Sequence, residues 1–155
     1  AATVVPVGQP VFVSIPPDQW QPVEGTLSSG GITAQVRAEP VGLRVITGDP
    51  AALGAVCDGP GRPFRADTDR SPAAQSQDPG ACVVRYRTAS AGHRAAGSGG
   101  TDEVRPATWL GTVTVVWSAQ WRVGGGPWID LGEIPRTRLV ARAARDLTTS
   151  VQTPG

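Results

Sequence analysis

The chain has 155 residues, which is enough for one domain with a hydrophobic core. Its 14 basic residues, all arginine, and its 13 acidic residues leave a net charge of +1, which gives no field that favours nucleic acid or an anionic membrane. No apolar run approaches the roughly 18 residues of a membrane-spanning helix, and the 20 Gly and 15 Pro residues are typical of short strands joined by turns.

The first third of the chain predicts strands separated by turns. In QPVFVSIPP, three apolar residues share one face of an extended segment that ends at Pro16-Pro17: Val11, Val13 and Ile15. In GITAQVRAEP, four apolar residues alternate with polar ones and are expected to point inward: Ile32, Ala34, Val36 and Ala38. Pro40 is expected to end this strand, and VGLRVITGDP to form a shorter one that closes at the turn Gly48-Asp49-Pro50.

Residues 51–81 form the largest irregular region and are expected to be a surface loop. A disulfide between Cys57 and Cys82 would tie its ends, enclose about 25 residues, and stabilise the fold by roughly 3 kcal/mol. Two unrelated buried thiols are the alternative. A disulfide would imply an oxidising, extracytoplasmic location. The two cysteines are not expected to bind a metal, because no His or Cys lies near either of them at the spacing of metal ligands.

The second half of the chain contains the clearest strand. CVVRYRT is extended with Tyr86 inward, and a second long loop follows at 89–108. TVTVVWSAQW then alternates, which puts Trp117 and Trp121 on one face and predicts that both are core residues between two sheets. The apolar spacing within 136–147 slightly favours an amphipathic helix, whereas the β context and the preceding Pro135 favour a strand, which is the structure we expect.

Several stretches together resemble a family of exported actinobacterial proteins with a PKD-like, immunoglobulin-like β-sandwich: FVSIPPDQWQPVEGTLSSGGITAQVRAEP, GLRVITGDP, CDGPGRPF, CVVRYRTAS and VTVVWSAQW. The resemblance covers about residues 10–145. It implies one antiparallel sandwich of about seven strands with two long loops and flexible termini over 1–155, located outside the cytoplasm. Val45 and Ile46 stand where the family has Trp and Asp, and Pro50 replaces its glycine. Members are mostly of unknown function.

No constellation in the sequence points to catalysis. The single histidine, His93, lies in a Gly/Ser-rich stretch where a general base would be poorly positioned. The loop carboxylates, including Asp67 and Asp69, have no apolar wall to raise their pKa, and they lack the spacing of a calcium loop. There is no phosphate-binding loop. We therefore expect no catalytic residue, no metal and no cofactor.

The expected function is that of a secreted or cell-surface module for protein binding or structural assembly, which self-associates through exposed sheet edges or contacts a partner. The alternative is a domain that binds cell-wall glycan. For either role the tryptophans outside the predicted core are the candidate surface residues: Trp20, Trp109 and Trp128. The favoured interpretation, however, is that these three side chains close the ends of the hydrophobic core between the two sheets and bind nothing.

Overall fold

The computed structural model describes residues 3–91 and 108–145. Its elements in chain order are β1 (Thr3–Pro6), β2 (Val11–Phe12), the 3-10 turn η1 (Pro17–Gln19), β3 (Val23–Ser29), β4 (Ile32–Ile46), β5 (Ala55–Cys57), α1 (Pro72–Gln75), β6 (Val83–Val84), β7 (Trp109–Val123) and β8 (Ile129–Arg145). His93 and most of the predicted loop at 89–108 lie outside the described residues.

The strands form two sheets. The larger has six strands in the order β1-β8-β7-β4-β3, with β5 also paired to β4, and the smaller pairs β2 with β6. Only β1 and β8 run parallel among these pairs. The prediction of an all-β chain is confirmed, and the strand interpretation of 136–147 is right for 136–145, since β8 ends at Arg145. Residues 146 and 147 lie outside the described residues.

Strand β4 continues through Pro40, so the prediction that Pro40 separates two strands is wrong. The pairing with β7 shifts by one residue between Pro40 and Gly42, which is a β-bulge. β3 pairs with β4 only as far as Ala38, and β5 begins its pairing at Leu43. Pro40 therefore lies where β4 has a neighbour on one side only, and a residue without an N–H is tolerated there.

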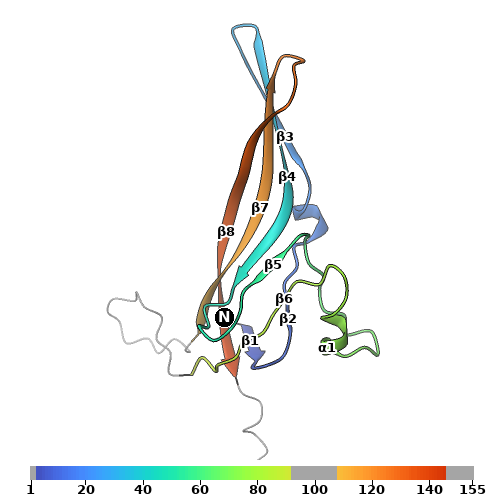
Figure 1. The fold of residues 1–155 in the computed structure, drawn as a ribbon, viewed down its shortest axis with the longest axis vertical. Coiled ribbons are helices and arrows are strands. Elements are labelled where there is room, and N and C mark those ends of the chain that lie inside the picture. Colours follow the sequence, from blue (N-terminus) through green and yellow to red (C-terminus); the bar gives the residue numbers. More distant parts are fainter. Residues whose placement is uncertain (1–2, 92–107, 146–155) are drawn as a thin grey trace, which may run out of the picture.

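The long strands divide the molecule into two regions (Figure 1). One region, called the base, holds β1, β2, β5, β6 and the adjoining halves of the long strands. The other, called the arm, consists of β3, residues 32–40 of β4, 117–123 of β7 and 129–135 of β8, and it extends away from the remaining elements. The hydrophobic core lies in the base and comprises Val5, Leu43, Val45, Cys82, Val84, Tyr86, Trp109 and Ala144.

Buried polar contacts hold the base together. The Asp49 carboxylate accepts the N–H groups of Ala51 at 2.9 Å, Arg87 at 2.8 Å and Thr88 at 2.9 Å. Burial raises the pKa of Asp49, but these hydrogen bonds lower it by more, so the net shift is downward. Gly48, in the same turn, has φ +82°, and an added Cβ would overlap a backbone carbonyl of β7.

The loop 51–81 contains more structure than the sequence predicted. Its start forms β5, and Cys57 is joined to Cys82 with a Cα–Cα distance of 5.8 Å. Further on, the α1 turn places the side chain of Gln75 inside the loop. The Gln75 amide accepts the N–H of Arg65 at 3.0 Å and donates to the carbonyl of Arg65 at 2.8 Å and to that of Arg70 at 3.0 Å. The loop is thus fastened both at its ends and in its middle.

Candidate partner-binding surface

One face of the arm is apolar across all four of its strands. The register places Val36 of β4 opposite Trp121 of β7, and Trp121 opposite Ile129 of β8. On the other side of β4, Leu27 of β3 lies opposite Ala34. Because side chains alternate along a strand, these rows of partners share one face, which we call the apolar face of the arm.

The apolar face of the arm is not covered by any element in the described part of the chain. Leu27 is 74% exposed and Ile32 is 62% exposed, and five further large apolar residues of this face are also exposed: Val23, Val36, Val123, Ile129 and Ile134. The prediction that residues 32–38 point into a core is therefore wrong for Ile32 and Val36. A contiguous apolar surface of this kind is typical of an interaction site.

The two tryptophans predicted for the core also lie on this face. Trp117 and Trp121 are half-buried, and neither belongs to the core cluster. Their shared face was predicted correctly, but their place between two sheets was not, because the second sheet is too short to reach them: it pairs only Val11–Phe12 with Val83–Val84. Tyr86, the third predicted core residue, is buried in the core.

The three tryptophans predicted as surface residues do not form one surface. Trp109 is only 5% exposed and donates its indole N–H to the carbonyl of Thr88 at 2.9 Å, so it is a core residue and not the candidate binding residue that the alternative interpretation made it. Trp20 is half-buried and packs against the core. Trp128 lies between Arg37 and Arg122, whose guanidinium carbons are 4.1 and 4.5 Å from its ring centroid. The flat tryptophan array that the glycan hypothesis requires is absent from the described residues.

Among the described residues, no strand pairs with the outer edge of β8 over residues 129–141, since β1 pairs only with 142–145. The carbonyl of Arg145 accepts the N–H of Val7 at 2.9 Å, so the odd-numbered residues of β8 direct their backbone groups outward there. The register with β7 is unbroken from Gly132 to Arg142. Thr137 and Leu139 therefore direct their N–H groups toward the free side. We call this stretch the open edge.

Beside the open edge lies a cleft of about 730 Å³ between the large sheet and residues 11–15. Its walls are mostly apolar, with Val11, Val13 and Ile15 on one side and Val113 and Val115 on the other. This volume is within the range of ligand-binding pockets.

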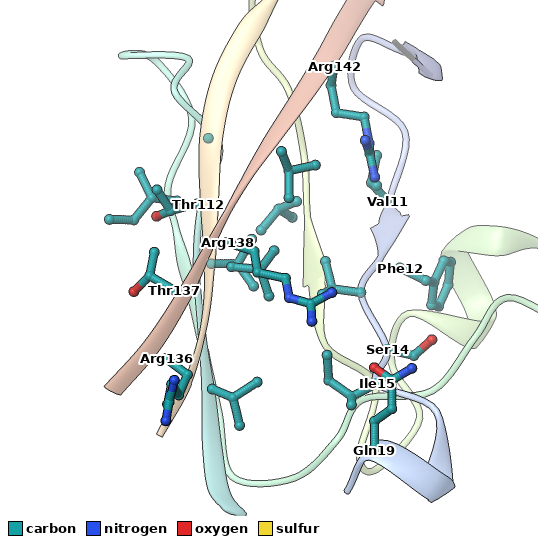
Figure 2. A pocket seen from close by; sticks show the side chains of 18 of the residues that line it. Val11, Phe12, Ser14, Ile15, Gln19, Thr112, Arg136, Thr137, Arg138 and Arg142 are labelled. Atoms are coloured by element: carbon teal, nitrogen blue, oxygen red, sulfur yellow. The ribbon is translucent and has the colours of Figure 1, made fainter. Parts of the chain in front are cut away.

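Three arginines of β8 line the cleft: Arg136, Arg138 and Arg142. Figure 2 shows Arg138 and Arg142 extending from β8 toward the segment that carries Val11, whereas Arg136 lies further along the strand. The cleft lining contains no Asp or Glu. The ion pairs among the described residues lie elsewhere: Arg44–Glu133, Arg65–Asp67 and Arg70–Asp78. The cleft is thus apolar with a positively charged rim.

Sequence reasoning did not single out these arginines as a site. In RTRLVAR they occur at alternating positions, which places them on one face once the segment is a strand. That signal was present, but the competing helical interpretation distributed the same residues around an axis.

The described residues contain no group of three or more potential metal ligands. Within the same ranges, no helix has the length and apolar character needed to cross a membrane. The candidate site thus consists of an apolar face, an open strand edge beside it and a cationic rim.

The chain matches no protein-family model, no curated protein and no solved structure. The resemblance to exported PKD-like proteins therefore gains no support from these comparisons.

Proposed function

We propose that this protein is a non-catalytic module that binds a protein partner by accepting an extended strand of that partner at the open edge of β8. The observation that carries the proposal is the backbone of residues 129–141, which no other described strand pairs with and which runs along the border of an apolar face that the described elements leave uncovered. An added strand would satisfy outward N–H and C=O groups and cover apolar side chains in one step.

The edge is suited to pairing over its central part. Leu139 and Thr137 supply outward N–H groups, whereas Pro135 has none and interrupts the ladder at one position. Natural edge strands are commonly protected by a covering element or a bulge. The bulge of β8 lies between Asp130 and Gly132, near the tip of the arm, so it does not protect residues 136–141.

The finer expectations from the sequence belong to the same proposal. We infer that the protein acts outside the cytoplasm, because a bridge between Cys57 and Cys82 is stable in an oxidising compartment. We also infer that the base is an immunoglobulin-like or PKD-like sandwich, in which the β2–β6 pair is the second layer. The support for this is the antiparallel pairing of the long strands and the core that lies between the two sheets.

The test removes one hydrogen-bond donor from the open edge. Leu139→Pro deletes the outward N–H at a position whose side chain is 71% exposed. Leu139→Ala keeps the N–H and removes most of the side chain, so it is the matched control. Each variant is immobilised and presented to solubilised envelope proteins of the producing organism, after circular dichroism has established that it is folded.

We expect native protein and Leu139→Ala to retain the same partner, and Leu139→Pro to lose it. Retention of the same partner by folded Leu139→Pro would refute strand addition at this edge. Loss of the partner from both variants would assign the contact to the Leu139 side chain instead and would equally refute it.

A further inference from the structure

The charge pattern beside the open edge constrains the strand that could pair with it. Arg136 and Arg138 occupy alternate positions of β8, on the face that borders the cleft. In the register with β7 they lie opposite Val115 and Val113, so β7 offers neither of them an acidic neighbour. Residues two apart in a strand are separated by about 7 Å, so both arginines face the same side of any strand that is added.

These arginines have no carboxylate partner among the described residues. The ion pairs in this part of the chain involve other arginines, and the cleft contains no acidic side chain. Arg142 adds a third positive charge on the same face. This charge also acts on the buried Tyr86: burial raises the pKa of Tyr86, and the nearby Arg142 partly offsets that rise. A chain with a net charge of only +1 therefore concentrates uncompensated positive charge at one place.

We propose that the partner strand carries two acidic side chains two residues apart, which pair with Arg136 and Arg138, flanked on the same face by apolar residues. This inference rests on the strand addition proposed above. Side chains directly opposite on neighbouring strands have Cβ atoms about 5 Å apart, which is within the reach of Arg and Asp or Glu. The planar guanidinium can bind a carboxylate through two hydrogen bonds.

The flanking residues follow from the same register. On this face Ile134 precedes the two arginines and Val140 follows them. Ile134 is exposed and Val140 lines the cleft, so apolar partner residues opposite them would cover apolar surface. The resulting pattern is apolar-x-acidic-x-acidic-x-apolar. It reads the same in both directions, so it holds for a parallel and for an antiparallel partner.

A second copy of this chain does not supply that pattern from its own free edge. The other edge of the large sheet is β3. On the face that would continue the arginine face, β3 presents Val23, Gly25, Leu27 and Ser29, and none of these is acidic. Pairing of β3 with β8 of another copy would leave Arg136 and Arg138 without carboxylates. The charge pattern therefore favours a different protein, and not a second copy of this chain, as the source of the added strand.

The test uses a capped synthetic peptide, Thr-Val-Thr-Glu-Thr-Glu-Thr-Val-Thr, labelled and titrated with the full chain. One comparison peptide has Lys in place of both Glu residues, and another has its two Glu residues adjacent, so that they point to opposite faces. The protein variants are Arg136→Gln/Arg138→Gln and, as a matched control for loss of charge at a distance, Arg87→Gln on an exposed side chain.

We expect the alternating Glu peptide to bind about threefold more tightly than the adjacent-Glu peptide, which keeps one of the two cross-strand ion pairs, and at least about tenfold more tightly than the Lys peptide, which has neither. The double Gln variant should lose this preference, Arg87→Gln should keep it, and added salt should weaken binding to the native protein.

Equal binding of the Glu and Lys peptides to native protein, with Leu139→Pro abolishing both, would refute the acidic pattern and leave strand addition intact. Peptide binding that Leu139→Pro does not reduce would refute strand addition and this inference with it. A failure of all peptides, together with binding of anionic lipid vesicles that depends on Arg136 and Arg138, would also overturn the inference.

Discussion

The base and the arm are built from the same strands, yet they differ in what lies against them. Along β7, Val113 and Val115 pack against the core while Trp121, on the same face, lies beyond it. The difference is supplied by short elements: β1, β2, β5 and β6 cover the base, and none of them extends to the arm (Figure 1). Alternation therefore specifies a strand with an apolar face, and separate segments decide whether that face becomes a core or stays available to a partner.

The largest expected effect contrasts two tryptophans of β7. Trp109→Ala should lower the free energy of unfolding by about 3–5 kcal/mol, because it removes a buried ring from the core and leaves a cavity. It also deletes the hydrogen bond to Thr88. Trp121→Ala, on the arm, should cost much less, since that ring is only half-buried. Urea denaturation of both variants measures the contrast, and equal losses would contradict the division into base and arm.

The disulfide comes next in size. Cys57→Ala/Cys82→Ala should lower the free energy of unfolding by about 3 kcal/mol, because the unfolded chain regains the entropy of a closed loop of this length. The cost should be confined to the base, where the bridge connects β5 to the residue before β6. Denaturant midpoints with and without reductant check this. A native midpoint that reductant does not change, while alkylation shows both thiols free, would contradict it.

The sequence was sufficient to predict the elements whose signal is long. Alternation over β4 and β7 predicted extended structure correctly, whereas the second half of β8 was predicted from its β context against a periodicity that slightly favoured a helix. Two cysteines at either end of a long loop, without neighbours at metal-ligand spacing, predicted the disulfide. Three strands were missed. β1 and β5 have four residues or fewer, which is too short for a periodicity to be recognised, and the Gly and Ser residues of β3 are typical of a connector.

The arm was not predictable by the same means. An apolar face looks the same in sequence whether another layer covers it or not, so Trp117 and Trp121 were assigned to a core that does not reach them. For Trp109, at the start of a strand, the sequence left plugging of the sandwich end and a binding surface both open, and its contacts with Thr88 and the core exclude the binding surface.

Replacing Asp49, in the base, should cost less stability than removing the disulfide, and the cost should depend on pH. Asp49→Asn should cost about 1–3 kcal/mol, since an amide cannot accept all three N–H groups that the carboxylate accepts. The pKa of Asp49 is lowered in the folded state. Its stabilising contribution is therefore present above the unfolded pKa of about 3.9 and is lost as the pH falls through the folded pKa.

Thermal unfolding of native protein and Asp49→Asn between about pH 2 and pH 7 checks this sign. The two stabilities should converge toward the acid end and differ most near neutrality. A difference that grows on acidification would mean that the carboxyl is protonated in the folded protein, and the hydrogen-bond geometry around it would have to be reassigned.

The smallest change in stability is expected from substitutions on the apolar face of the arm. They test most directly whether the arm, unlike the base, leaves its apolar side chains unpacked. Leu27→Thr/Ile32→Thr/Val36→Thr replaces three exposed apolar side chains of the apolar face with threonine, a β-branched residue that suits a strand. Exposed substitutions of this kind usually change the free energy of unfolding by no more than about 0.5 kcal/mol each. The melting temperature should stay close to that of the native protein.

The same triple variant should nevertheless bind the partner less tightly, because the apolar area that a partner covers has decreased. Unfolding and partner affinity are therefore measured on one preparation, with Leu53→Thr, at a still more exposed apolar position outside the arm, as the control. A large loss of stability in the triple variant would show that these side chains are packed within the monomer. The apolar face would then belong to the fold and not to an interface, and the distinction between the two regions would disappear.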